Sequence, residues 1–277
     1  MGDYGPTVLP DHSTQVDQPL QQAPSNEISV LVTGFGPFKT NLVNASFLIA
    51  QSLPSSFTFP APKNSHEADR RVILHVHPSP IPVAYSSVRE ALPSILSDFE
   101  AANQGRRPDI VIHIGIASPR LYYSVESLAH RDDYNITDIK GCSGYEDGEK
   151  IWKDLGLPAI LSPGKAIPLT QEQEDEQKKQ GVRSGPCPPN DNFLGTWKSN
   201  ASAGLDLRIS HDAGHYLCDF IFYTSLSLAM QKGQDRNVLF LHVPGAAEDA
   251  DIERGREITL ALIKTMITCW IDDKHSA

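Results

Sequence analysis

The sequence predicts an α/β fold: a single domain with a mostly parallel central sheet and helices on both faces. Four apolar runs rich in β-branched residues, at 28–32, 71–76, 110–115 and 237–244, predict strands. Segments with helical apolar spacing follow them, and this alternation is typical of βαβ units, whose crossovers place helices on both sides of a parallel sheet. The 277 residues, 40% hydrophobic and 21% charged, are enough for one large core.

Two segments fall outside this alternation. Residues 1–26 are rich in Pro, Gln, Asp and Ser and predict a disordered tail, so the domain is expected to span 27–277. Residues 142–204 hold a charge run at 171–180 and a Pro-rich stretch at 186–189. Their apolar content is too thin for a separate core, and we interpret them as an irregular surface excursion.

Charge and cysteine content limit the partners. The 24 basic and 34 acidic residues give a net charge of −10, which argues against nucleic acid and anionic membranes. Neither a membrane-length apolar run nor a secretory signal is evident, and the four Cys lack zinc-like spacing. We therefore expect a cytoplasmic protein with reduced thiols, no membrane partner and no metal site, and the oligomeric state stays open.

The first strand leads into a loop that carries candidate binding residues. Phe35 and Phe38 flank Gly36-Pro37 directly after strand 28–32. They are either ordinary core residues or a flat apolar clamp for a small ring. Asn44 stands just ahead of the apolar helix predicted at 47–53, where it could cap that helix.

The middle elements predict where a ligand would bind. After strand 71–76, a helix at 81–103 with a kink or restart at Pro93 leads to the continuous apolar strand 110–115. Ligands of such sheets bind beyond the carboxyl ends of the strands. The loops after the strands at 28–32 and 110–115 should lie there. Glu126 falls in an extended or hairpin segment at 121–128, where it is either a solvated charge or a buried one that needs a partner.

Cys218 is placed where a nucleophile would be. A strand at 205–210 and a polar turn precede it, and a helix at 219–232 follows it. The helix dipole and unpaired N–H groups at such a position favour a thiolate, although a small buried Cys is the alternative. His242 ends the next strand, and we expect it and Cys218 at the same sheet edge, with Glu126 at a third loop there. A Cys with a His base and a carboxyl orienter is the arrangement of cysteine hydrolases. The last helix, at 252–270, should cover one sheet face.

Three motifs in this order resemble a known family, type I pyroglutamyl peptidase (pyrrolidone-carboxyl peptidase). They are VTGFGPF (32–38) with VNAS (43–46), DAGHYLCDF (212–220) in the animal-type form, and FLHVP (240–244). A weaker match at 115–126 places Glu126 on the family's catalytic glutamate. Lys39, Ser127 and Arg131 depart from the residues that are usual in the family.

The resemblance implies a cytosolic cysteine exopeptidase that removes an N-terminal pyroglutamyl residue from peptides and needs neither metal nor cofactor. It implies Cys218 as nucleophile, His242 as base and then acid, and Glu126 as the group that orients the imidazole. It also implies that Phe35 and Phe38 sandwich the pyrrolidone ring and that Asn44 lies near the substrate backbone.

Three alternatives remain. The chain could be a catalytically silent pyroglutamyl-binding or interaction protein on the same fold, although a binding module has no need of a nucleophile. It could be a redox sensor with Cys218 as its reactive thiol, which would need a resolving Cys nearby. A nucleotide-binding protein is disfavoured because residues 33–36 have neither a GxGxxG motif nor a P-loop Lys.

Overall fold

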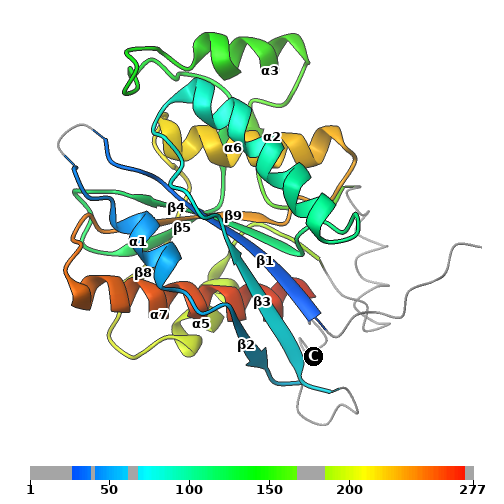
Figure 1. The fold of residues 1–277 in the computed structure, drawn as a ribbon, viewed down its shortest axis with the longest axis vertical. Helices are drawn as coiled ribbons and strands as arrows, with labels where there is room; N and C mark the ends of the chain where they lie inside the picture. The colour runs from blue at the N-terminus through cyan, green and yellow to red at the C-terminus, as the bar shows by residue number, and fades with distance from the viewer. Residues whose placement is uncertain (1–26, 39–40, 62–67, 167–184, 272–277) are drawn as a thin grey trace, which may run out of the picture.

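In the computed structural model, the described residues are 27–38, 41–61, 68–166 and 185–271. They form a seven-stranded sheet between two helical layers (Figure 1). The sheet order is β2-β3-β1-β4-β9-β5-β8, and β6 pairs with β7 separately. The strands are β1 (Glu27–Gly34), β2 (Ser56–Phe59), β3 (Arg70–Val76), β4 (Ile110–Ile116), β5 (Tyr123–Glu126), β6 (Ala129–His130), β7 (Ile160–Leu161), β8 (Leu207–Ser210) and β9 (Val238–Val243).

Strand direction confirms the mostly parallel sheet. The four neighbours β3, β1, β4 and β9 run parallel, whereas β2 pairs antiparallel with β3 and β5 pairs antiparallel with β9. Because β8 is parallel to β5, it also runs against the four-strand core. The strand ahead of Cys218 is therefore reversed relative to that core.

In the part of the chain that the structure describes, six α-helices cover the two faces. They are α1 (Ala45–Ser52), α2 (Tyr85–Ala102), α3 (Lys150–Asp154), α5 (Asp191–Asn200), α6 (Leu217–Gln231) and α7 (Asp249–Met266), with π-helical turns at Tyr145–Glu149 and Ile267–Ile271. Pro93 lies inside α2, which is one helix and does not restart there. Within the described ranges, no helix has the length and apolar character needed to cross a membrane.

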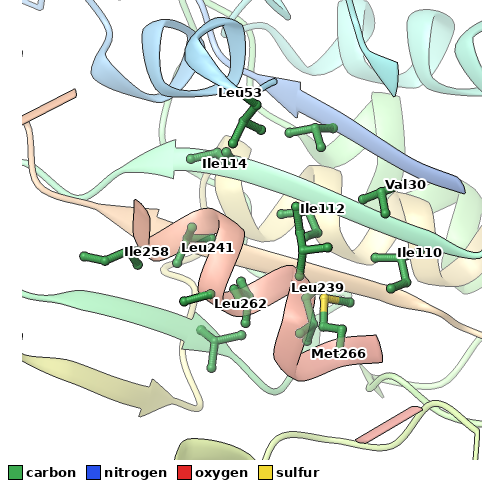
Figure 2. Packing of buried hydrophobic residues seen from close by; sticks show 14 of the residues in the cluster. Val30, Leu53, Ile110, Ile112, Ile114, Leu239, Leu241, Ile258, Leu262 and Met266 are labelled. Atoms are coloured by element: carbon green, nitrogen blue, oxygen red, sulfur yellow. The ribbon is translucent and has the colours of Figure 1, made fainter. Parts of the chain in front are cut away.

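On one face of the sheet, α1, α5 and α7 close a core of aliphatic side chains. Alternate residues of the parallel strands point into it, among them Val30, Ile112 and Leu239, which are fully buried. Figure 2 shows Leu262 and Met266 of α7 meeting these side chains. The predicted final helix is thus confirmed as a cover of this face.

On the other face, α2, α3 and α6 close a core that is rich in aromatic rings. The Phe220 ring of α6 lies 4.9 Å from the rings of both Tyr85 and Trp152. The intervening strand residues, such as Val111 and Phe240, point to this side. Every position of β4 and β9 is therefore buried, and this explains why their sequences are continuous apolar runs.

The range 142–204 is more regular than the sequence indicates. It contains α3, β7 and α5, and Phe193 and Trp197 of α5 are buried in the core against α7. A short helix with two core aromatics has too few apolar residues to stand out in a polar, Pro-rich context. The predicted tail at 1–26 and the charge run at 171–180 lie outside the described residues.

Candidate active site

Cys218 is the second residue of α6, as the strand–turn–helix pattern predicts. The helix begins after Tyr216, whose backbone is extended and whose side chain does not cap the helix. Gly214 in the preceding turn has a φ of 75°, and its N–H donates to the Asp212 carboxylate at 2.8 Å. Left-handed backbone at this position favours Gly. This turn brings the chain from β8 over the sheet, so that the helix starts with its amino end at the carboxyl ends of β4 and β9.

The thiol lies directly against β4. A Cβ at Gly115 would be 2.9 Å from the Cys218 Sγ and 2.6 Å from the Phe240 Cζ, so only Gly fits there without a shift. Gly115 pairs with His242 across the β4–β9 ladder. The structure therefore places the thiol and the imidazole at neighbouring positions on the α6 face of the sheet.

Glu126 is the partner of His242. The His242 Nδ1 and the Glu126 Oε1 are 2.6 Å apart, and both side chains are almost completely buried. The contact arises because β5 runs antiparallel beside β9, with Ser124 opposite His242 and Glu126 opposite Phe240, so that Glu126 shares the α6 face with His242. Glu126 is thus buried with a partner. The extended segment predicted at 121–128 contains the strand β5, which runs antiparallel to β9 and carries Glu126 to the site.

Arg120 is a site residue that the sequence analysis missed. Its Nη1 donates to the Glu126 Oε1 at 3.0 Å and to the Ser124 Oγ at 2.8 Å. Its Nη2 reaches the Asp212 carbonyl oxygen at 3.4 Å. One guanidinium therefore links the carboxylate to the turn that precedes the nucleophile. Its position six residues ahead of Glu126 in the same loop was the available signal.

The electrostatics of the site keep the thiol protonated in the absence of a base. Burial raises the pKa of the Cys218 thiol well above its usual value, and the Glu126 and Asp219 carboxylates raise it further. The Arg120 guanidinium acts in the opposite direction. A neutral thiol is a weak nucleophile, so catalysis would require His242 to accept the proton.

The two candidate aromatics differ in exposure. Phe35 is buried, with 3% of its surface exposed, in the core on the α2 and α6 side. Phe38 is partly buried, and its ring lies 6.4 Å from that of Tyr216, two residues before Cys218. Both pack in the cluster that Cys218 also contacts, so the structure brings them to the nucleophile's side of the sheet.

Asn44 takes the capping position considered from the sequence. Its Oδ1 accepts from the Ser46 N–H at 3.1 Å and from the Ser46 Oγ at 2.8 Å, and its Nδ2 donates to the Gly36 carbonyl oxygen at 2.8 Å. The Ser46 Oγ in turn accepts from the Phe35 N–H at 3.0 Å. Asn44 therefore holds the Phe35 loop against the start of α1.

Of the residues that depart from the family pattern, Ser127 and Arg131 make their side-chain contacts away from the Glu126 carboxylate. Ser127 contacts His211 and donates to the Ser210 carbonyl oxygen at 3.1 Å. Arg131 pairs with Asp132 at 2.8 Å. The cation beside Glu126 is Arg120 instead. Lys39 lies outside the described residues.

Comparison with known proteins identifies relatives of this chain. The family model described as pyroglutamyl peptidase matches residues 28–154 and 196–266. The chain is 27% identical over 247 residues to pyroglutamyl-peptidase 1 of Rattus norvegicus, covering 86% of this chain and 90% of that one. It is 28% identical over 218 residues to pyrrolidone-carboxylate peptidase of Pyrococcus furiosus, covering 78% and 81%.

Solved structures show the same fold. A mutant pyrrolidone carboxyl peptidase from Pyrococcus furiosus superposes with a TM-score of 0.59 at 22% identity, covering 87% of this chain and 99% of that one. Pyrrolidone carboxyl peptidase from Thermococcus litoralis gives 0.58 at 20% identity, covering 90% and 99%. Since the family model matches well over half of the sequence, the chain belongs to the pyroglutamyl peptidase family.

Proposed function

We propose that this protein is a cysteine exopeptidase that hydrolyses the amide bond after an N-terminal pyroglutamyl residue. The observation that carries the proposal is the arrangement of three side chains. The Cys218 thiol lies against Gly115, Gly115 pairs with His242, and the His242 imidazole is 2.6 Å from the Glu126 carboxylate. Thiol, imidazole and carboxylate in this relation form the triad of a cysteine hydrolase.

The substrate class follows from the surroundings of the thiol. A pyroglutamyl residue is a flat, uncharged lactam without a free α-amine, so a carboxylate or metal that holds an amino terminus finds nothing to bind. Aromatic faces and a few backbone hydrogen bonds suit such a ring. We propose that Phe35 and Phe38 contact the ring and that Asn44, by holding the Phe35 loop, lies near the substrate backbone.

The reaction proceeds in two steps. Glu126 accepts the Nδ1–H of His242, which leaves Nε2 to take the Cys218 proton as Sγ attacks the pyroglutamyl carbonyl carbon. Backbone N–H groups of the first turn of α6 point toward the developing oxyanion. The C–N bond breaks, the imidazolium gives its proton to the leaving amine, and a thioester remains.

Water then completes the cycle. His242 takes a proton from water, and the hydroxyl attacks the thioester carbonyl. The Cys218 Sγ then leaves and takes this proton from His242. The products are free pyroglutamate and a peptide with a new amino terminus. Since every bond and proton is handled by these residues, the proposal includes no cofactor. A cytoplasmic location is also proposed, because a reducing compartment keeps a nucleophilic thiol such as that of Cys218 reduced.

The test is hydrolysis of a fluorogenic pyroglutamyl amide by the purified, reduced protein. We expect turnover of this amide, none of a prolyl amide, and loss of at least about 10³-fold in kcat for Cys218→Ala. A folded, reduced protein that does not turn over the amide would contradict the proposal. It would instead favour a silent pyroglutamyl-binding protein, which the same amide, used as a ligand, would detect by calorimetry.

A further inference from the structure

A second group of chemically active side chains lies beside the triad and takes no part in its mechanism. His130 of β6, His215 of the turn before α6 and Asp219 of the first turn of α6 each offer one ligand atom, and these atoms lie within 4.8 Å of one another. The fold brings together two segments here, β6 with His130 and the start of α6 with His215 and Asp219. In the described ranges, no other three side chains of His, Cys, Asp or Glu lie close enough together to share one ion.

Its distances are close to those of a metal site. The His130 Nδ1 and the His215 Nδ1 lie 3.2 Å and 3.9 Å from the same oxygen, Oδ2 of Asp219. Bonds of about 2.0–2.1 Å in a tetrahedral zinc site place neighbouring ligand atoms about 3.3–3.4 Å apart. The His215 Nδ1 lies 3.0 Å from the Asp132 carbonyl oxygen, so His215 gives up this hydrogen bond and moves closer to the Asp219 Oδ2 when it binds the ion.

The carboxylate is oriented for this role. Asp219 is fully buried, and its Oδ1 accepts the backbone N–H of His130 at 3.0 Å, which turns Oδ2 toward the two imidazoles. Such outer contacts fix the ligands of metal sites. The imidazoles are 22% and 39% exposed, so an ion can reach them from solvent. Two imidazoles and one carboxylate are the donors of a three-ligand zinc site with an open fourth position.

We propose that His130, His215 and Asp219 bind a divalent first-row transition ion, with Zn²⁺ as its representative, at a site separate from the Cys218 nucleophile. The ion replaces the hydrogen bond between His130 and Asp219 and ties the turn before α6 to β6. Asp219 directly follows Cys218, so the ion fixes the helix turn on which the nucleophile stands. The proposal does not depend on the peptidase reaction.

The experiment uses Cys218→Ala protein, because a thiol beside an imidazole is itself a metal ligand. Isothermal calorimetry should show about one equivalent of Zn²⁺ bound, and Zn²⁺ should raise the melting temperature. Adding His215→Ala should weaken binding by at least about tenfold, since even outer contacts of metal sites contribute 10–100-fold. His211→Ala, in the same turn but outside the group, is the matched control and should bind as the parent does.

Two further measurements distinguish binding at this site from binding by other side chains of the protein. Co²⁺ absorption should show nitrogen and oxygen ligands without the charge-transfer band of a thiolate, which excludes Cys142, Cys187 and Cys269. Asp219→Asn preserves the side-chain shape and should also abolish binding in protein whose circular dichroism is unchanged. Equal Zn²⁺ affinity in the His215→Ala and His211→Ala proteins, or no binding by the Cys218→Ala parent, overturns the proposal. Either result would leave the three residues as a hydrogen-bonded anchor between β6 and α6.

Discussion

Arg120 is the residue whose charge acts on two members of the proposed triad, Glu126 and Cys218. It is bonded to the Glu126 carboxylate and lowers the pKa of the Cys218 thiol, against burial and two carboxylates that raise it. Its side chain is 25% exposed, so water screens part of this effect. Arg120 does not touch the reacting atoms in this structure and is best described as a positioning residue.

Replacing Arg120 with Gln should lower kcat/KM about tenfold, a loss of about 1.4 kcal/mol of transition-state stabilisation. Removal of the cation raises the thiol pKa, so the acidic limb of the pH–rate profile and of Cys218 alkylation by iodoacetamide should move to higher pH. Arg120→Lys should return the acidic limb most of the way to its wild-type pH. Arg208→Gln, which removes an exposed ion pair with Asp206, should change neither the pH–rate profile nor the alkylation profile. An unchanged alkylation profile in Arg120→Gln would contradict this account.

His113 makes the stability of the protein depend on pH. It is fully buried in the central strand β4, where its Nδ1 and the Thr33 Oγ1 are 2.7 Å apart, and burial lowers its pKa to about 3. Between pH 3 and 6.5 the unfolded chain binds a proton at this imidazole and the folded protein does not. The free energy of unfolding therefore falls as the pH is lowered through that window.

From pH 7 to pH 5 the contribution of His113 should fall by about 2 kcal/mol, at about 1.36 kcal/mol per pH unit below 6.5. Urea unfolding of the wild type and of His113→Gln at both pH values measures it. The variant starts less stable because it loses a packed side chain, but it should lose about 2 kcal/mol less on acidification. An equal loss in the two proteins would show that His113 does not titrate in this way.

At the scale of the elements, the site depends on how closely α6 approaches β4. The amino end of α6 comes near enough that the Cys218 Sγ and the Phe240 ring leave no room for a side chain at Gly115. The α6 helix also carries Phe220, whose ring packs against Trp152 of α3 in the aromatic core. This packing holds α6 at its distance from the sheet. The position of the nucleophile is thus set by helix–sheet packing.

Gly115→Ala should therefore reduce activity more than stability. The new Cβ displaces Sγ or the Phe240 ring, and a misplacement of about 1 Å can lower the rate about 10²-fold, whereas overpacking costs about 1–3 kcal/mol of stability. Amide hydrolysis and urea unfolding measure the two effects. Gly195→Ala in α5, where a Cβ meets nothing within 4 Å, is the control and should leave activity unchanged while adding about 0.5–1 kcal/mol of stability. Full activity in Gly115→Ala would contradict the close approach.

At the scale of the whole molecule, two cores share one sheet. Trp152 lies in the core under α2, α3 and α6, and Trp197 and Trp270 lie in the core under α1, α5 and α7. The strands β1, β4 and β9 contribute residues to both cores. Neither core can be lost without exposing one face of the same strands, so the two are expected to unfold together.

Tryptophan fluorescence can report each core separately. A Trp197→Phe, Trp270→Phe variant leaves only Trp152, and Trp152→Phe leaves the other two. Within each variant, the fluorescence midpoint in urea should equal the midpoint of far-ultraviolet circular dichroism, as in a two-state transition. Fluorescence and circular dichroism midpoints that separate in either variant would mean that one core unfolds before the other. The measurement also tests whether residues 27–277 form a single domain.

Local patterns in the sequence were sufficient for most of the sheet and for the position of Cys218 at the start of a helix. The buried strands predicted around Val32, Ile112 and Leu241 are confirmed, because burial on both faces demands a continuous apolar run. The Asn44 cap and the position of Cys218 at the start of a helix are likewise confirmed, since capping and turn chemistry act over a few residues. The motif residues Cys218, His242 and Glu126 were also identifiable from the sequence.

Tertiary structure alone decided how these parts meet. The contact of Glu126 with His242 spans 116 residues and depends on the reversed direction of β5, a strand of four residues that is too short to reveal its orientation. Arg120 and Trp197 likewise have partners far away in the chain: Arg120 reaches the Asp212 carbonyl oxygen across 92 residues, and Trp197 donates to the Ile258 carbonyl oxygen across 61 residues. Side-chain periodicity reports which face is buried, but not which segment lies across from it, because that is settled by packing of the whole core.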